Sequence, residues 1–189
     1  MAQVPRAEAM SREGKGTQAS SEAGRSQPLS WSEVEGRLAG GGWFWLATVR
    51  PDGGPHLVPL FAAWAGTSFF IASKDRARKS RNLEADSRCV ISTDTGDLHV
   101  IVEGVAHHVR DEVGLQRAAE AFQAVYGWPT RIQGSQLDAD YGAPTSGGAP
   151  YEAYEVTPVK AFGFPTDGET ITPTRWTWPS SIAQQAASP

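Results

Sequence analysis

Five short apolar runs separated by turn sequences constrain the fold of this chain most strongly. The runs cover residues 43–50, 56–64, 67–72, 88–93 and 97–110, and the breaks include PDGG at 51–54 and AG at 65–66. Runs of this length with such breaks predict an antiparallel meander. Pro59 lies inside the second run, and because proline has no N–H to give to a sheet, it predicts an edge strand or a bulge.

Three helices are expected around these strands. Ser30 and Glu33 have capping-box spacing before a short amphipathic run at 31–39. A basic segment predicts a helix at 77–85 with Asp75 as its N-cap, and residues 111–126 predict the longest helix. Residues 128–150 predict a long loop, and strands follow at 151–164 and 174–178. Six or seven mostly antiparallel strands with inserted short helices indicate an α+β fold with a closed or nearly closed barrel.

Both ends of the chain are expected to be loose. Residues 1–29 are rich in Ser, Gly, Glu and Arg, so they predict a disordered tail, and residues 179–189 predict a second one. One domain is then left at 30–178. Whether the natural start is Met1 or Met10 stays open.

Charge and cysteine content exclude several classes of protein. The net charge is -4, which argues against a general nucleic-acid binder, and the single cysteine allows no intrachain disulfide. No apolar stretch approaches the roughly 20 residues of a membrane span, and the N-terminus has no signal-peptide core. A reducing, cytoplasmic setting is the expectation.

Nucleophilic and metal-dependent catalysis find little support. There is no G-x-S-x-G motif, and Cys89 lies in an apolar run typical of a core thiol. The histidines lack zinc-site spacing; His107 and His108 are adjacent on a predicted strand and so face opposite sides. One surface and one partly buried histidine are therefore expected, and no catalytic side chain or metal site is predicted.

A basic segment is the clearest candidate for a binding site. Residues 74–88 contain six basic and three acidic side chains, directly after a predicted strand and at the start of a helix. Helix N-termini and arginine or lysine side chains suit a phosphate group. A solvated basic helix face is the competing interpretation. Dense aromatic residues add a second, weaker indication: most belong to a core, and some are available to border a planar ring near Pro59.

The order of several motifs resembles a known family. Between residues 44 and 93 the chain has a strand, PDG-x-PH-x-x-P, a second strand, RKSRNLEADSR and V-I-S, and the later YEVTPVKAFGF and TRWTW match the last strands. This pattern resembles the flavin/deazaflavin oxidoreductases of the split β-barrel superfamily, which are related to pyridoxamine 5′-phosphate oxidase and share an FMN-binding-like fold. The similarity covers about residues 31–178. Ser87 departs from the family, which commonly has a proline there.

The resemblance implies a homodimer with the cofactor in a groove at the subunit interface. It also implies which residues hold the cofactor. By position these are Val58, Pro59, Leu60, Phe61, Ser73, Lys74, Arg78, Lys79, Arg81, Asn82 and Trp176.

The implied chemistry is hydride transfer between the cofactor ring and a small organic substrate, unsaturated or quinone-like, which needs no protein nucleophile. Coenzyme F-420, a deazaflavin, is preferred as cofactor because of the RKSRNL segment, with FMN as the alternative. A non-catalytic flavin or deazaflavin carrier, an FMN-dependent pyridoxamine phosphate oxidase and a haem-binding relative are the other readings.

Overall fold

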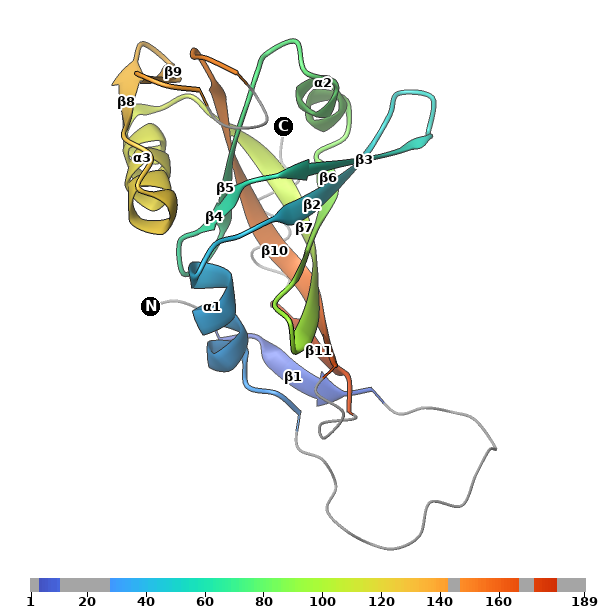
Figure 1. Cartoon of the computed structure of the whole chain (residues 1–189). Helices are drawn as coiled ribbons and strands as arrows, with labels where there is room; N and C mark the ends of the chain where they lie inside the picture. Colours follow the sequence, from blue (N-terminus) through green and yellow to red (C-terminus); the bar gives the residue numbers. More distant parts are fainter. Residues whose placement is uncertain (1–3, 11–27, 143–146, 167–171, 180–189) are drawn as a thin grey trace, which may run out of the picture.

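The computed structural model describes residues 4–10, 28–142, 147–166 and 172–179, and every structural statement concerns these residues. The helices are α1 (Trp31–Ala39), α2 (Arg78–Ala85) and α3 (Glu112–Tyr126). The strands are β1 (Arg6–Ala9), β2 (Phe44–Val49), β3 (Pro55–Leu60), β4 (Ala62–Trp64), β5 (Phe69–Ser73), β6 (Arg88–Asp94), β7 (Leu98–Val109), β8 (Thr130–Gln133), β9 (Gln136–Ala139), β10 (Glu152–Pro165) and β11 (Thr174–Thr177) (Figure 1).

The strands form a barrel that closes through a bend in the chain. The neighbours run β3-β2-β6-β7-β10, and β10 also pairs with β5, which pairs with β4. Strand β3 is at one end of this order of neighbours and β4 is at the other. Only Phe61 separates them in the chain, so one bent segment joins the two ends of the sheet. The α+β split barrel expected from the sequence is therefore present.

The long strand β10 belongs to two parts of the sheet. Its first residues, 152–156, pair with β5, and residues 160–163 pair with β11, while β7 follows its other side throughout. The register shifts between Pro158 and Lys160. Gly104 of β7 lies opposite this point, and a Cβ there would come within 2.8 Å of the Thr157 carbonyl oxygen. The backbones of β7 and β10 therefore come very close at Gly104, near the point where β10 changes its pairing partner.

The N-terminal segment contains a strand that the predicted tail did not include. Residues Arg6–Ala9 form β1 and pair with the outer edge of β11. Glu8 forms an ion pair with Arg175 at 2.5 Å, and the Met10 N–H donates to the Pro173 carbonyl at 2.8 Å. An available sheet edge thus orders a segment with little intrinsic strand preference. Residues 1–3, 11–27 and 180–189 of the two predicted tails lie outside the described residues.

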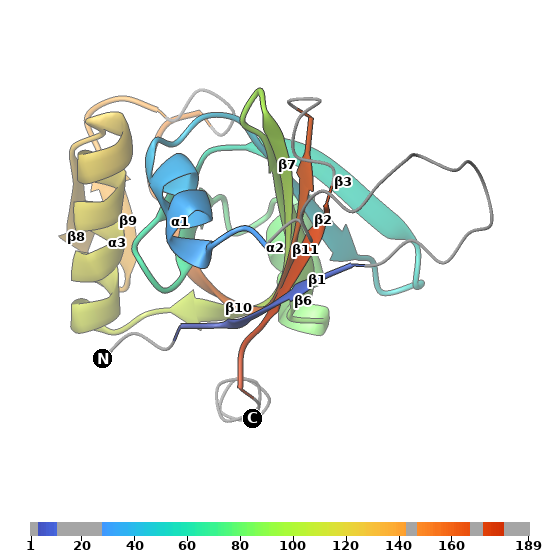
Figure 2. The same cartoon turned by 90° about the horizontal axis from the view of Figure 1, so that it is seen from below.

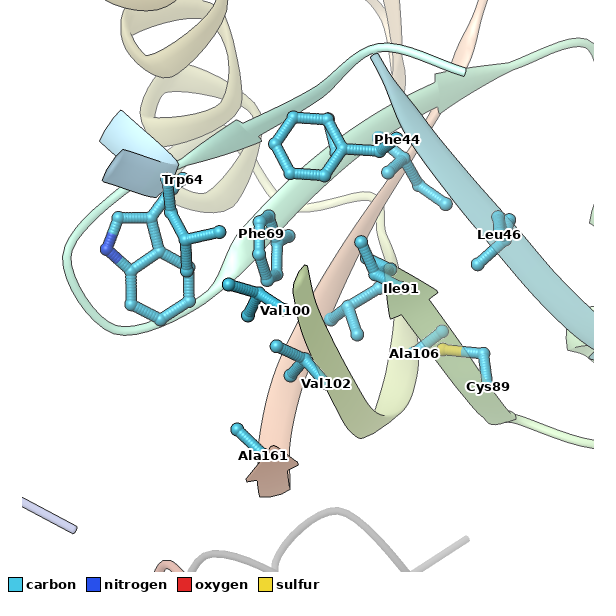
Figure 3. Close-up of a cluster of buried hydrophobic side chains, with 14 of the residues drawn as sticks. Phe44, Leu46, Trp64, Phe69, Cys89, Ile91, Val100, Val102, Ala106 and Ala161 are labelled. Carbon is cyan, nitrogen blue, oxygen red and sulfur yellow. The ribbon is translucent and has the colours of Figure 1, made fainter. Parts of the chain in front are cut away.

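Helix α1 closes one end of the barrel. Ser30 and Glu33 form the expected capping box, and Val34 and Leu38 are buried. The Trp31 ring contacts those of Trp64, Trp176 and Trp178, with centroids 5.9, 5.4 and 4.8 Å away. Beyond them the barrel is filled by the aliphatic and aromatic side chains of Figure 3, including Phe44, Leu46, Phe69, Ile91, Val100 and Val102.

Helix α3 and the hairpin β8–β9 form a second layer beside the barrel (Figure 2). The Asp111 side chain caps α3 by accepting from the Gly114 N–H at 2.9 Å, and Gly127 ends it at φ 61°. The expected loop at 128–150 was wrong in part, because residues 130–139 form this hairpin around Gly134 at φ 63°. Four-residue strands with mostly polar side chains give too little alternation to predict. None of the helices in the described ranges is long and apolar enough to cross a membrane.

Candidate anion and ring-binding site

Helix α2 lies at the end of the barrel opposite to β11, close to β2 and β6 (Figure 1). Its N-cap residue is Ala77, in extended conformation, and no side chain caps the helix. The prediction of Asp75 as N-cap was wrong, because the helix begins later, at Arg78, and Asp75 stays exposed. The first turn has no acidic residue and starts with Arg78 and Lys79. Cations at this end oppose the helix dipole, typically by 0.3–1 kcal/mol, so the sequence does not favour α2 in isolation.

Buried hydrogen bonds fasten α2 to the barrel. The Ser80 hydroxyl lies 2.8 Å from Ser73 Oγ and 2.7 Å from the Lys74 carbonyl oxygen. Asn82 Nδ2 donates to Thr48 Oγ1 of β2 at 2.9 Å. Ser73, Ser80 and Asn82 have no exposed surface. The start of α2 therefore has a fixed position relative to β2 and β5.

We call the three cations whose charges act on His56 of β3 the cation cluster: Arg50, Arg78 and Lys79. Burial, and then the charges of Arg50, Arg78 and Lys79 in that order, lower the pKa of His56. Burial also lowers the pKa of Lys79. Among the described residues, no ion pair joins the three cations to a carboxylate. Their positive charge is thus concentrated and uncompensated.

Several residues implied by the resemblance lie elsewhere in the structure. The Lys74 ammonium donates to the carbonyls of Gly148 and Pro150 and lies 4.7 Å from the Tyr151 ring centre. Arg81 is exposed and lies on the side of α2 opposite Lys79. Trp176 has no exposed surface and donates from Nε1 to the Leu29 carbonyl. Within one chain these three side chains are not part of the cation cluster.

Asn82 has one hydrogen-bonding atom left over. Its Oδ1 is buried and has no partner among the described residues. A buried unpaired amide oxygen is costly, typically 1–3 kcal/mol. The inner side of α2, which packs on β2, therefore contains an unpaired hydrogen-bond acceptor.

The edge strand β3 joins the cation cluster to an aromatic group. In the part of the chain that the structure describes, β3 pairs with β2 alone, with Pro59 opposite Trp45, so the expectation of an edge at Pro59 is confirmed. Val58 is partly buried against the core and Leu60 is buried. Phe61 occupies the bend between β3 and β4.

We call the aromatic group around Phe61 the aromatic ledge; it consists of Trp43, Phe61 and Tyr126. The Phe61 ring centre is 4.5 Å from that of Trp43 and 5.2 Å from that of Tyr126. The Tyr126 hydroxyl donates to the carbonyl oxygens of Gly42 and Ala62, and burial raises its pKa to about 12. Trp43 is 57% exposed and its ring is tilted by 37° from that of Phe61, so the ledge presents an aromatic ring to solvent.

A second polar cluster lies under the C-terminal half of α2. His108 Nε2 is 2.5 Å from Glu152 Oε2, and its Nδ1 is 3.8 Å from Glu84 Oε1 of α2. The ring of Tyr154 stacks on His108 at 4.7 Å, and burial raises the pKa of Tyr154. No sequence signal links His108 to Glu152, because the residues lie 44 positions apart. This cluster connects α2 to β7 and β10.

The outer face of the barrel is apolar and uncovered in the described structure. Trp45 is 47% and Leu57 60% exposed. Next to them lies a cavity of about 590 Å³ whose lining includes Ala47, Val90 and Val105. We call the surface around this cavity the outer face.

Comparison with known proteins agrees with this fold. The sequence model described as pyridoxamine 5′-phosphate oxidase matches residues 31–161, which is well over half of the chain. The chain belongs to the pyridoxamine 5′-phosphate oxidase family. The match includes β3, α2 and the cation cluster, and it does not by itself assign the oxidase activity. No curated protein sequence matches the chain.

Several solved structures are similar in fold at low sequence identity. A conserved hypothetical protein from Mycobacterium tuberculosis is 19% identical, with a TM-score of 0.55 over 75% of this chain and 88% of that one. A heme binding protein from Mycobacterium smegmatis is 18% identical, with a TM-score of 0.52 over 73% and 55%. A NimC/NimA family protein from Clostridium acetobutylicum is 16% identical, with a TM-score of 0.50 over 75% and 91%. At this identity the likeness concerns the fold and leaves the ligand open.

Proposed function

We propose that this protein is an oxidoreductase that binds coenzyme F-420, with FMN as the alternative cofactor. It would transfer a hydride between the cofactor ring and a small organic substrate, unsaturated or quinone-like. It would act as a homodimer with the site at the subunit interface. The family assignment and the resemblance support this class of chemistry.

The cation cluster is the observation that carries the proposal. Arg78 and Lys79 begin an uncapped helix, and Arg50 and His56 approach it from the β2–β3 hairpin. A half-buried lysine without a carboxylate partner is unfavourable in the free protein, because burial disfavours its charged form. An anionic group at the helix N-terminus would compensate these charges and accept from its free N–H groups. The residues therefore fit a phosphorylated cofactor.

The length of β3 fits a ring joined to such an anion. His56 and Leu60 are four residues apart on the extended strand β3, which spans about 13 Å at roughly 3.3 Å per residue, and Phe61 follows at the bend. One end thus offers positive charge, and the other offers the aromatic ledge. The open edge of Val58–Leu60 between them supplies backbone groups to a planar heterocycle, as the resemblance implies.

When bound, the flavin or deazaflavin ring supplies the redox chemistry. The protein's own part is to hold the anion, to fix the ring along β3 and to exclude water from the reacting face. These tasks need no nucleophile or metal ligand from the chain, and positioning alone contributes substantially to rate.

The outer face is the surface proposed for dimerisation. Exposed Trp45 and Leu57 form an apolar surface of the kind that marks protein contacts. Light scattering should give twice the chain mass for the wild type. The Trp45→Glu variant should give the monomer mass and weaker cofactor binding. A wild type that is monomeric at micromolar concentration contradicts this part of the proposal.

Cofactor titration tests the main proposal. F-420 fluorescence should be quenched, or FMN absorbance shifted, with a dissociation constant in the micromolar range or below. Binding of neither cofactor would overturn the proposal. Reduced cofactor should then be mixed with a panel of unsaturated and quinone acceptors. Tight binding without oxidation by any acceptor favours the carrier, and oxidation supports the enzyme.

A further inference from the structure

His56 is held by a chain of two buried polar side chains. Thr48 and His56 face each other across the β2–β3 register, and Thr48 Oγ1 is 3.3 Å from His56 Nδ1. Asn82 Nδ2 donates to the same Thr48 oxygen at 2.9 Å. Thr48 is 3% exposed and Asn82 fully buried, whereas His56 is partly exposed. This series of hydrogen bonds thus connects the inner side of α2 to the partly exposed imidazole of His56.

These hydrogen bonds suit a neutral imidazole that accepts at Nδ1. Since Thr48 Oγ1 accepts from Asn82, its own hydrogen is free to be donated to His56 Nδ1. A neutral ring that accepts at Nδ1 carries its hydrogen on Nε2. His56 can then offer an N–H donor toward the cation cluster without carrying a charge.

The charged surroundings of His56 come from two directions. Arg50 follows β2, next to β3, and Arg78 and Lys79 belong to α2. All three repel a proton on the ring, and burial acts in the same direction, so the pKa of His56 is lowered. A bound anion would raise the pKa of His56, because its negative charge would lie among these same groups and favour the protonated ring.

We propose that His56 is a proton-linked ligand of the anion site. Its Nε2–H donates to the bound anion, and Nδ1 takes up one proton from the buffer as the anion binds, while the Thr48 hydroxyl rotates to accept from Nδ1. The imidazole then carries one positive charge beside the anion. The identity of the anion rests on the proposed function; the role of His56 does not.

Binding and protonation must then depend on each other. An anion that raises the proton affinity of His56 is itself bound more tightly at lower pH. The expected gain is up to about tenfold in affinity per pH unit while one proton is taken up. Sulfate is a suitable probe, because its own charge does not change between about pH 5.5 and about pH 8, the range in which histidine titrates.

The first experiment follows His56 directly by NMR. The His56 ring signals, assigned with the His56→Gln variant, are titrated with pH in the presence and absence of sulfate. The pKa of His56 should rise with sulfate. The ring signals of His99, an exposed histidine on β7, serve as the control for non-specific effects of sulfate. An unchanged His56 titration overturns the inference. Thr48→Val removes the acceptor for protonated Nδ1, so the rise in the pKa of His56 with sulfate should become smaller; a rise of unchanged size refutes the role of Thr48.

The second experiment measures F-420 binding by calorimetry in two buffers that differ in ionisation enthalpy. Wild-type protein should take up close to one proton on binding. His56→Gln keeps an N–H donor near the Nε2 position but cannot be protonated, so its affinity should vary less with pH and its proton uptake should disappear. His99→Gln should behave as wild type.

The outcomes separate the two proposals. F-420 binding without proton uptake, or with uptake retained in His56→Gln, overturns the role of His56 and leaves the cofactor assignment intact. Absence of F-420 and FMN binding overturns the cofactor assignment, and the sulfate titration then decides on His56 alone.

Discussion

Replacing Lys79 with methionine separates binding from stability. Methionine has a similar length and no charge. In the free protein the Lys79 ammonium is half-buried, and burial lowers its pKa. Because the charged form is disfavoured on folding, Lys79→Met should leave the free energy of unfolding unchanged or raise it by up to about 1 kcal/mol. That corresponds to at most about 2–4 °C in Tm for a domain of this size.

The same variant should bind the cofactor more weakly. A charge-assisted hydrogen bond contributes about 1.5–3 kcal/mol, so affinity should fall about tenfold to a hundredfold. Fluorescence titration gives the affinity, and chemical unfolding of the free protein gives the stability. The stability difference should shrink as the pH rises through the lowered pKa of Lys79, because wild-type Lys79 then loses its charge.

Two neighbouring cations serve as controls. Lys74→Met removes the donor to the carbonyls of Gly148 and Pro150 and should lower the stability by about 1 kcal/mol. Arg81→Met changes an exposed side chain on the opposite side of α2 and should alter neither quantity much. If Lys79→Met loses stability as Lys74→Met does and keeps its cofactor affinity, the cation cluster is a structural feature and the reasoning fails.

Three further expectations concern the scaffold. Gly104→Ala should lower the free energy of unfolding by about 2 kcal/mol, because its Cβ would lie 2.8 Å from the Thr157 carbonyl; an unchanged Tm would contradict this packing. Asp111→Ala should cost about 1 kcal/mol in urea unfolding, since the Gly114 N–H loses its acceptor, and Asp111→Asn should recover most of it. Burial raises the pKa of Cys89 to about 12, so the thiol stays protonated below that pH. Iodoacetamide near pH 8 should label it only after unfolding; rapid labelling of native protein would show that the core opens.

Signals confined to neighbouring residues predicted the fold well. The capping box at Ser30 and the apolar period of α3 depend on contacts within one or two turns, so the sequence contains them completely. The edge at Pro59 follows from the missing N–H of proline. Strand β1 could not be predicted in this way, because Arg6–Ala9 becomes a strand only beside β11, nearly the whole chain away.

The candidate site was predicted in outline but not in detail. The charge count located the basic segment. It could not show that Lys79 is half-buried while Arg81 is exposed on the opposite side of the helix, because this depends on where α2 begins. His56 was missed as a member, since its partners Thr48 and Asn82 come together only when α2 packs on β2. Trp176 was expected at the cofactor, but in one chain the packing of Trp31 encloses it.

Two prolines on β3 decide what can approach this side of the barrel. Pro55 and Pro59 lie in a strand whose second edge is left open in the described structure. An open edge usually invites another chain to add a strand, which leads to aggregation. A strand with two missing N–H groups is a poor template for such a ladder. The edge can therefore remain accessible to a small planar molecule while discouraging uncontrolled assembly.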